Sequence, residues 1–317
     1  METYEATFIT IITMSSPLVF AVIGETISER VGIVNLSMEG TLLITALAGF
    51  ATTIITNSPY IGILASGLLG GSIAVFIVLV NFKFYINQIA IGFILTILLW
   101  KLSSYLGQPY VRIPGPYLDI ITIPYLSEIP FIGPVIFDNN IITISSIFLI
   151  PISWYFLFKT QLGINLRSVG ENPESADARG INVRKTRLLY AMLGGILIGI
   201  GGAAFSLHVK YGWSEGHTIN YGWIALAIVI FGGWNPVRGS LGVYGFGALQ
   251  VLALKLQSVT IGFSQILPLI PFPLMILTLV LIQSANKNSG LGVPRIIRIL
   301  ILGNQPQALG ITYKKDV

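Results

Sequence analysis

Long apolar runs, separated by short and sparsely charged stretches, dominate this chain. A helix that crosses the roughly 30 Å hydrocarbon core of a bilayer needs about 20 mostly apolar residues. Only 10% of the 317 residues are charged, whereas an ordinary soluble domain has about 25%. The chain is therefore predicted to be an all-α, polytopic integral membrane bundle of about 8–10 transmembrane helices. The candidate spans lie near residues 7–23, 38–56, 60–80, 88–106, 140–158, 188–207, 221–234, 238–256 and 265–284.

Two stretches leave the number of crossings open. The run at 221–234 is short and leads into Gly-Gly-Trp-Asn-Pro at 232–236. Because glycine and proline end helices, this run is either a full crossing or a broken helix. Residues 24–38 are similarly ambiguous, and either lie in the cytoplasm or re-enter the bilayer.

Basic residues predict the orientation of the spans. With the N-terminus outside, fourteen of the 18 Lys and Arg residues fall on the inner side. Six of them lie in residues 159–187 and five in residues 285–317. Because cytoplasmic loops carry an excess of Lys and Arg, we expect a multi-pass protein of the cell membrane with its C-terminus in the cytoplasm.

The hydrophilic regions are short, so a single membrane domain over residues 1–284 is expected. Residues 107–139 contain six prolines and are interpreted as an ordered external loop. Residues 159–187 form the predicted cytoplasmic loop. Residues 285–317 form a short basic cytoplasmic tail that is too small for a second domain.

Glycines recur inside the predicted spans at spacings that favour helix packing. Gly67 and Gly71 are four residues apart, and so are Gly195 and Gly199. Small residues in this register let helix backbones approach closely in lipid. Packing within the chain is the simpler interpretation, and a subunit interface is the alternative.

The cytoplasmic loop carries the signals of a two-turn helix at about residues 173–179. Asn172 is a good N-cap, Pro173 suits the first helical position, and Gly180 suits the position after the helix. A helix this short is unstable alone and needs a surface to pack against. A docked loop helix without a special role is the alternative to a functional one.

This loop, GINLRSVGENPESADARGINVRKTR at 163–187, resembles the cytoplasmic coupling segment of ABC-transporter permeases. The resemblance is to the branched-chain amino acid, simple-sugar and nucleoside group. Three further stretches are similar to motifs of the purine-nucleoside-type permeases. They are GETISERVGIVNLSMEGTLL at 24–43, NQIAIG at 87–92 and GWIALAIVIFGGWNPVRG at 222–239. Together the matches cover roughly residues 20–250 and are more specific than any one of them.

The resemblance implies a permease subunit of an ABC importer, which moves a small polar solute by alternating access. The implied partners are ABC ATPase subunits, a second related permease (hetero- or homodimer) and an extracellular substrate-binding protein. A nucleoside is the first choice of solute, ahead of a simple sugar or a branched-chain amino acid. The residues expected to couple to the ATPase are Gly170, Glu171, Asn172, Pro173, Ala176, Ala178, Gly180 and Ile181.

No enzymatic chemistry or cofactor is expected. The sequence lacks a Gly-x-x-x-x-Gly-Lys-Ser/Thr phosphate loop, so ATP hydrolysis is assigned to a partner. The sequence has no cysteine and two histidines, which argues against a metal site and against an intramembrane enzyme.

Polar residues at the ends of the predicted spans are candidates for the translocation pathway. Asn35 and Glu39 either line a broken helix at the pore or cap the second span. Aromatic and amide side chains can stack on a planar base and read its edge, although Trp also anchors helices at membrane interfaces. The further candidates are Gln88, Trp223, Trp234 and Asn235.

An ion-coupled secondary transporter is the main alternative, and a channel is a weaker one. A proton relay would need titratable groups across the membrane. His208 and His217 both fall near the external end of a span, where surface or interface roles are expected. Nothing in the sequence resembles a selectivity filter.

Overall fold

The computed structural model describes residues 2–115, 118–130, 133–257, 273 and 305–313. Within these residues, seven helices are long and apolar enough to cross a membrane, so the predicted polytopic helical bundle is confirmed. The predicted span at 265–284 lies outside the described residues, apart from residue 273. The seven helices are α1 (Glu2–Arg30), α2 (Met38–Thr56), α3 (Pro59–Phe84), α4 (Gln88–Gly107), α5 (Ile141–Lys159), α8 (Val183–Ala204) and α10 (Pro236–Gln257).

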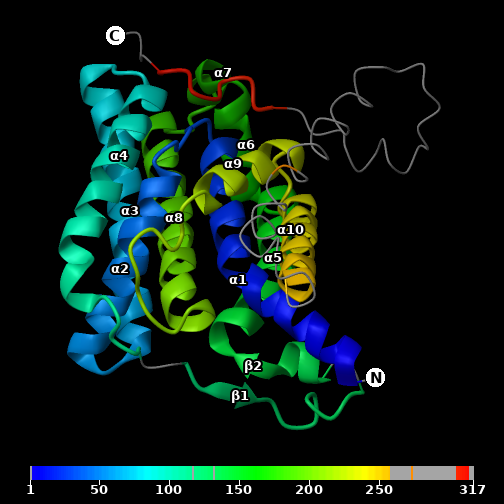
Figure 1. Ribbon diagram of the computed structural model, residues 1–317. Helices are drawn as coiled ribbons and strands as arrows, with labels where there is room; N and C mark the ends of the chain where they lie inside the picture. The colour runs from blue at the N-terminus through cyan, green and yellow to red at the C-terminus, as the bar shows by residue number, and fades with distance from the viewer. Residues whose placement is uncertain (1, 116–117, 131–132, 258–272, 274–304, 314–317) are drawn as a thin grey trace.

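Helix α1 lies at the centre of the bundle, where it packs against α8, α10 and α5. Its segment 15–29 is buried on every side, in keeping with an apolar helix surrounded by others. Figure 1 shows that α1 begins at one end of the bundle and that residues 305–313 lie across the other end, near α7. We call the end on which residues 305–313 lie the elbow end, because it carries α6 and α7, which form a bent pair of helices.

The glycines predicted to pack helices join α3 to α8. A Cβ atom added at Gly70 would lie 2.3 Å from the Gly195 carbonyl oxygen, and one at Gly199 would lie 2.1 Å from the Ser66 carbonyl oxygen. Side chains at these positions would separate the two backbones. Packing within the chain is therefore confirmed for the glycines of this face.

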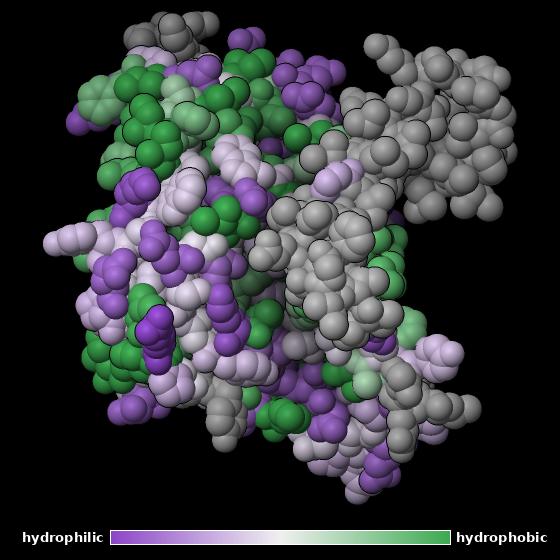
Figure 2. Space-filling view, in the orientation of Figure 1, coloured by the Kyte–Doolittle hydropathy of each residue, from purple (hydrophilic) through white to green (hydrophobic). Residues whose placement is uncertain are grey.

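The outer face of the bundle is apolar over several spans. Large apolar side chains of α3, α4 and α5 are exposed, and Figure 2 shows some of them over α4. Exposed apolar residues in this arrangement are suited to lipid. Examples are Leu64, Leu68, Ile94, Leu98 and Ile152.

Short elements connect the spans. The predicted external loop contains the 3-10 helix η1 (Gln108–Tyr110), the π-helix η2 (Gly133–Phe137) and two three-residue antiparallel strands, β1 (Ile120–Thr122) and β2 (Asp138–Asn140). The other end carries α6 (Gln161–Glu171) and α7 (Pro173–Ala178). A second π-helix, η3 (Phe205–Val209), extends α8, and α9 (Tyr221–Phe231) precedes α10. Helix α6 and the strands were not predicted from the sequence.

Candidate functional site

Helix α9 is a broken element inside the bundle. Its 11 residues extend about 16 Å, roughly half the thickness of a hydrocarbon core. It ends at Phe231, and Gly233 and Trp234 in the turn that follows have φ angles of 63° and 54°, in the left-handed region. Of the two interpretations of residues 221–234, the structure therefore supports a broken helix and not a full crossing.

Glu39 binds the first backbone groups of α9. Its carboxylate accepts hydrogen bonds from the N–H of Asn220 at 2.6 Å and from the N–H of Gly222 at 2.8 Å. A carboxylate at a helix N-terminus satisfies free N–H groups and suits the helix dipole. A Cβ atom at Gly222 would lie 2.4 Å from the Cα of Glu39, so glycine is needed for this close approach. One interpretation of the sequence was that Glu39 caps the second span, α2. In the structure Glu39 does cap a helix, but that helix is α9.

Arg30 and Glu29 at the end of α1 hold the other end of α9. Arg30 donates from Nε to the Trp234 carbonyl at 2.8 Å and from Nη2 to the Gly233 carbonyl at 3.0 Å. The Trp234 indole N–H donates to the carboxylate of Glu29. Both carbonyls belong to the turn that follows α9, which ends at Phe231. Opposite charges from α1 and α2 therefore hold the two ends of α9.

The turn between α1 and α2 is fixed by buried polar side chains. Asn35 accepts hydrogen bonds from the backbone N–H of Ser37 at 3.2 Å and from its hydroxyl at 2.6 Å. The N–H of Asn35 donates to Glu25 at 3.1 Å. Gln88, at the start of α4, accepts from the N–H of Val34 at 2.9 Å. This network fixes the backbone that leads from Arg30 to Glu39.

The predicted pathway residues fall into two groups. Asn35, Glu39, Gln88 and Trp234 are buried and hydrogen-bonded within the chain. Trp223 is 39% exposed. Asn235 is partly buried, and its side chain accepts a hydrogen bond from the N–H of Val237 at 3.0 Å. Contact of these residues with a solute stays a prediction.

The irregular segment 210–220 leads back along α2 toward α9. The hydroxyl of Ser206, just before the segment, donates to the Ala46 carbonyl at 2.9 Å, and Asn220 at the segment's end reaches Glu39. Figure 2 shows hydrophilic residues gathered on the face that Figure 1 shows this segment to cover. Within a membrane bundle, irregular backbone is tolerated where protein buries it or where it lines a polar cavity. Broken helices of transporters commonly form solute sites in this way.

His208 lies just before this segment and His217 lies within it, and both are held by hydrogen bonds. His208 is only 3% exposed and contacts Thr143 Oγ1 at 2.8 Å and the amide of Asn140. The expected surface position is therefore wrong for His208. His217 Nδ1 donates to the Ser214 carbonyl at 2.8 Å, and burial lowers the pKa of His217 to about 4.

The short helix predicted within residues 159–187 is present as α7. Asn172 accepts a hydrogen bond from the N–H of Ser175 at 2.9 Å, Pro173 is the first helical residue, and Gly180 has a φ of 84°. The predicted N-cap and the predicted glycine terminator are both confirmed. Helix α6 precedes α7 directly, so the two form a bent pair at residues 161–178, which we call the elbow.

Five residues of the elbow are buried, and two of them, Gly170 and Ala176, are predicted coupling residues. A Cβ atom at Gly170 would lie 2.0 Å from the Arg30 carbonyl oxygen, so α6 packs directly on the end of α1. Ala176 of α7 is 2% exposed. Asn172, Ala178 and Gly180 are exposed, whereas the remaining predicted coupling residues, Glu171, Pro173 and Ile181, are partly buried. The elbow thus presents one free face and one packed face.

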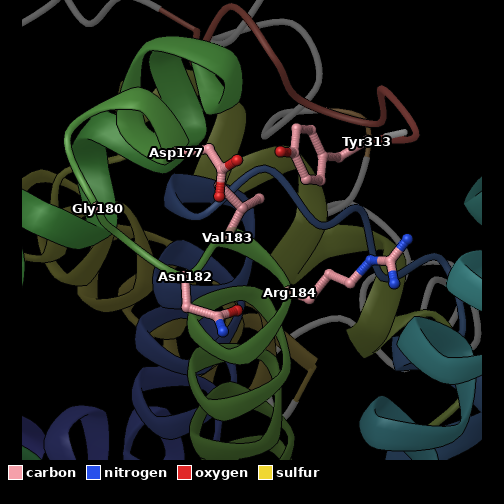
Figure 3. Close-up of a pocket in the computed structure, with 6 residues that line it drawn as sticks. All are labelled: Asp177, Gly180, Asn182, Val183, Arg184 and Tyr313. Carbon is pink, nitrogen blue, oxygen red and sulfur yellow. The ribbon is translucent and has the colours of Figure 1, made fainter. Parts of the chain in front are cut away.

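A cavity of about 450 Å³ lies beside the elbow. Figure 3 shows Asp177 of α7 and Tyr313 directed toward one another across it. The elbow, the start of α8 and the segment that ends at Tyr313 all contribute to its lining, which is formed by Asp177, Gly180, Asn182, Val183, Arg184 and Tyr313.

Comparison with known proteins assigns the family. The family described as the permease component of branched-chain amino acid transport systems matches residues 7–281. The chain belongs to this permease family. No solved structure matches it.

Named relatives in three organisms resemble this permease over most of their length. A putative glucose ABC transporter permease of Haloferax volcanii is 34% identical over 80% of this chain and 78% of its own. A nucleoside ABC transporter permease of Lactococcus lactis is 32% identical, covering 84% and 89%. A guanosine ABC transporter permease of Bacillus subtilis is 32% identical, covering 76% and 79%. Each organism has a second matching permease named for the same solute, at 25%, 28% and 21% identity respectively.

Proposed function

We propose that this permease is the membrane-spanning subunit of an ABC importer that carries a nucleoside into the cell. Separate ATPase subunits drive alternating access, and the permease itself performs no chemistry on the solute. Two of the three relatives described above are named for nucleosides or guanosine, which supports this solute class. The glucose permease of Haloferax volcanii makes a simple sugar the second choice.

A second, related permease completes the pore in this proposal. The paired permeases of three organisms, each pair named for one solute, support a heterodimer. The face over residues 210–220 is hydrophilic in Figure 2 and therefore poorly suited to lipid, which supports placing the pathway there. Trp223 and Asn220 are exposed at its inner end and are the first candidates for solute contact.

The elbow is the proposed docking site for the ATPase. Its exposed face is the observation that supports this role. Asn172 and Ala178 are exposed on the elbow, and Gly180 is exposed just after it. On the opposite face, Gly170 packs on Arg30 of α1. A force on α7 would therefore reach α1, whose Arg30 holds α9. The excess of basic residues in 159–187 supports a cytoplasmic elbow, an external N-terminus and a cytoplasmic segment 285–317.

Co-purification from native membranes tests the assembly. The tagged chain is solubilised in detergent, isolated, and its partners are identified by mass spectrometry. The proposal predicts an ATPase and a second permease, and a co-purified binding protein would then be screened against nucleosides, sugars and branched-chain amino acids. Recovery of the chain alone, in a form that transports solute without ATP, would instead favour an ion-coupled carrier.

A further inference from the structure

Residues 305–313, which we call the strap, bind the elbow end of the bundle through their backbone. The N–H of Ala308 donates to the Gly170 carbonyl at 2.9 Å, and the N–H of Gly310 donates to the Gly32 carbonyl at 3.1 Å. Gly170 belongs to α6, and Gly32 lies in the turn after α1. Figure 1 shows the strap crossing this end of the molecule, in red. The strap thus joins the elbow to the end of α1.

Buried side chains from two further helices also bind the strap. Arg187 of α8 is fully buried and donates from Nη1 to the Ile311 carbonyl at 2.8 Å. Asn81 of α3 donates to the Thr312 hydroxyl at 3.0 Å. A buried guanidinium needs acceptors in place of water, and the strap supplies them. The contacts therefore fix the strap against three helices, α3, α6 and α8, and against the turn that follows α1.

Gly170 lies between the strap and α1. On one side a Cβ atom at Gly170 would meet the Arg30 carbonyl at 2.0 Å, and on the other its own carbonyl accepts from Ala308. Arg30 in turn binds Gly233 and Trp234 at the end of α9. An unbroken series of contacts therefore runs from the strap and the elbow to the broken helix.

We propose that the strap is a positioning element of the coupling machinery, which holds the elbow on α1 and α8 so that movement of the elbow displaces α9. The proposal rests on the proposed ATPase-docking role of the elbow. Without the strap, α6 would keep its contact with Arg30 on one side only. The elbow would then move without carrying α1 and α9 with it, so ATP would be hydrolysed with little solute movement.

The variant Ala308→Pro tests the strap, because proline has no N–H to donate to Gly170. The complete transporter with its ATPase subunits is reconstituted in proteoliposomes, and solute uptake and ATP hydrolysis are measured together. Uptake per ATP should fall about tenfold, which corresponds to the loss of one hydrogen bond to a buried carbonyl. The control Gln305→Ala changes an exposed side chain at the start of the strap and should behave like the unaltered chain.

The outcomes separate the two proposals. If the unaltered transporter shows no ATP-dependent uptake, the proposed function fails. If the unaltered transporter works and Ala308→Pro keeps its uptake per ATP, the strap proposal alone is overturned. Assembly of each variant is checked by size-exclusion chromatography, and Arg187→Gln gives a second variant if Ala308→Pro does not assemble.

A disulfide tests whether the strap and the elbow move together. The chain has no cysteine, so the double variant Gln307→Cys, Glu171→Cys introduces one specific pair. The N–H of Gln307 lies 3.3 Å from the carboxylate of Glu171, and the neighbouring N–H of Ala308 donates to the Gly170 carbonyl at 2.9 Å, so the two backbones are adjacent. Uptake that persists after oxidation supports a strap that stays on the elbow. Uptake that stops on oxidation and returns on reduction would mean that the strap must detach, which contradicts the proposal.

Discussion

The guanidinium of Arg30 donates to the carbonyl of Trp234 over 2.8 Å, although 204 positions separate the two residues in the chain. At the other end of α9, Glu39 accepts from the N–H of Gly222. A short helix inside the bundle is thus held by an anion at its N-terminus, as the helix dipole favours, and by a cation that binds the turn after its C-terminus. The arrangement ties α9 to α1 and α2, and through Arg30 it connects α9 to the elbow.

Replacing Glu39 should loosen the start of α9. Glu39→Ala leaves the N–H groups of Asn220 and Gly222 without their acceptor, and the loss costs about 1–3 kcal/mol at the buried N–H of Gly222 and less at Asn220, which is exposed. Glu39→Gln keeps one acceptor oxygen and should lose less. Thermal unfolding in detergent measures both. Equal stability of Glu39→Ala and the unaltered chain would show that the carboxylate does not hold α9.

The variant Arg30→Lys should be destabilising although it keeps the charge. An ammonium lacks the planar fork that lets Arg30 bind the carbonyls of Gly233 and Trp234 together. The expected loss is about 1–3 kcal/mol in the free energy of unfolding, with reduced uptake. Arg112→Lys, at an exposed position in the loop between α4 and α5, is the matched control and should be neutral. Similar behaviour of the two variants would argue against a specific role for the fork of Arg30.

A methyl group at Gly170 should disrupt coupling at its contact with α1. In Gly170→Ala the new Cβ atom would lie 2.0 Å from the Arg30 carbonyl oxygen, so α6 must shift. Overpacking of this kind costs about 1–3 kcal/mol. Gly245→Ala is the control, because an added Cβ meets nothing within 4 Å there. We expect lower uptake per ATP for Gly170→Ala alone, and unchanged coupling would contradict the proposed path.

His217 should make stability depend on pH. Burial lowers its pKa to about 4, from about 6.5 in an unfolded chain. Because the folded state favours neutral imidazole, the contribution is present above pH 6.5 and is lost as the pH falls toward 4. The variant His217→Gln should flatten the unfolding profile over this range. An unchanged profile would mean that His217 does not titrate differently in the two states.

The elbow shows how much the sequence alone could predict. Asn172, Pro173 and Gly180 are local signals, and each takes the position in α7 that its chemistry favours. The spans were predictable for the same reason, since their apolar length is a property of consecutive residues. Helix α6 was missed because its amphipathic sequence carries no apolar run.

The contacts around α9 could not be predicted, because they join residues far apart in the chain. We expected Glu39 to line the pore or to cap its own helix, and it binds the backbone of residues 220–222. His208 was expected near the surface, and a π-helix turns it into the bundle toward Thr143. The docking of residues 305–313 on Gly170 and Arg187 likewise had no local signal.

Uptake by reconstituted proteoliposomes tests the central claim most directly. The complete transporter, with its ATPase subunits and binding protein, is sealed into vesicles, and entry of a radiolabelled nucleoside is followed with and without ATP on the ATPase side. Our account predicts uptake that requires ATP and the ATPase subunits and that persists when ionophores abolish all ion gradients. Uptake by the permease without ATPase subunits, driven by an ion gradient and stopped by ionophores, would contradict it.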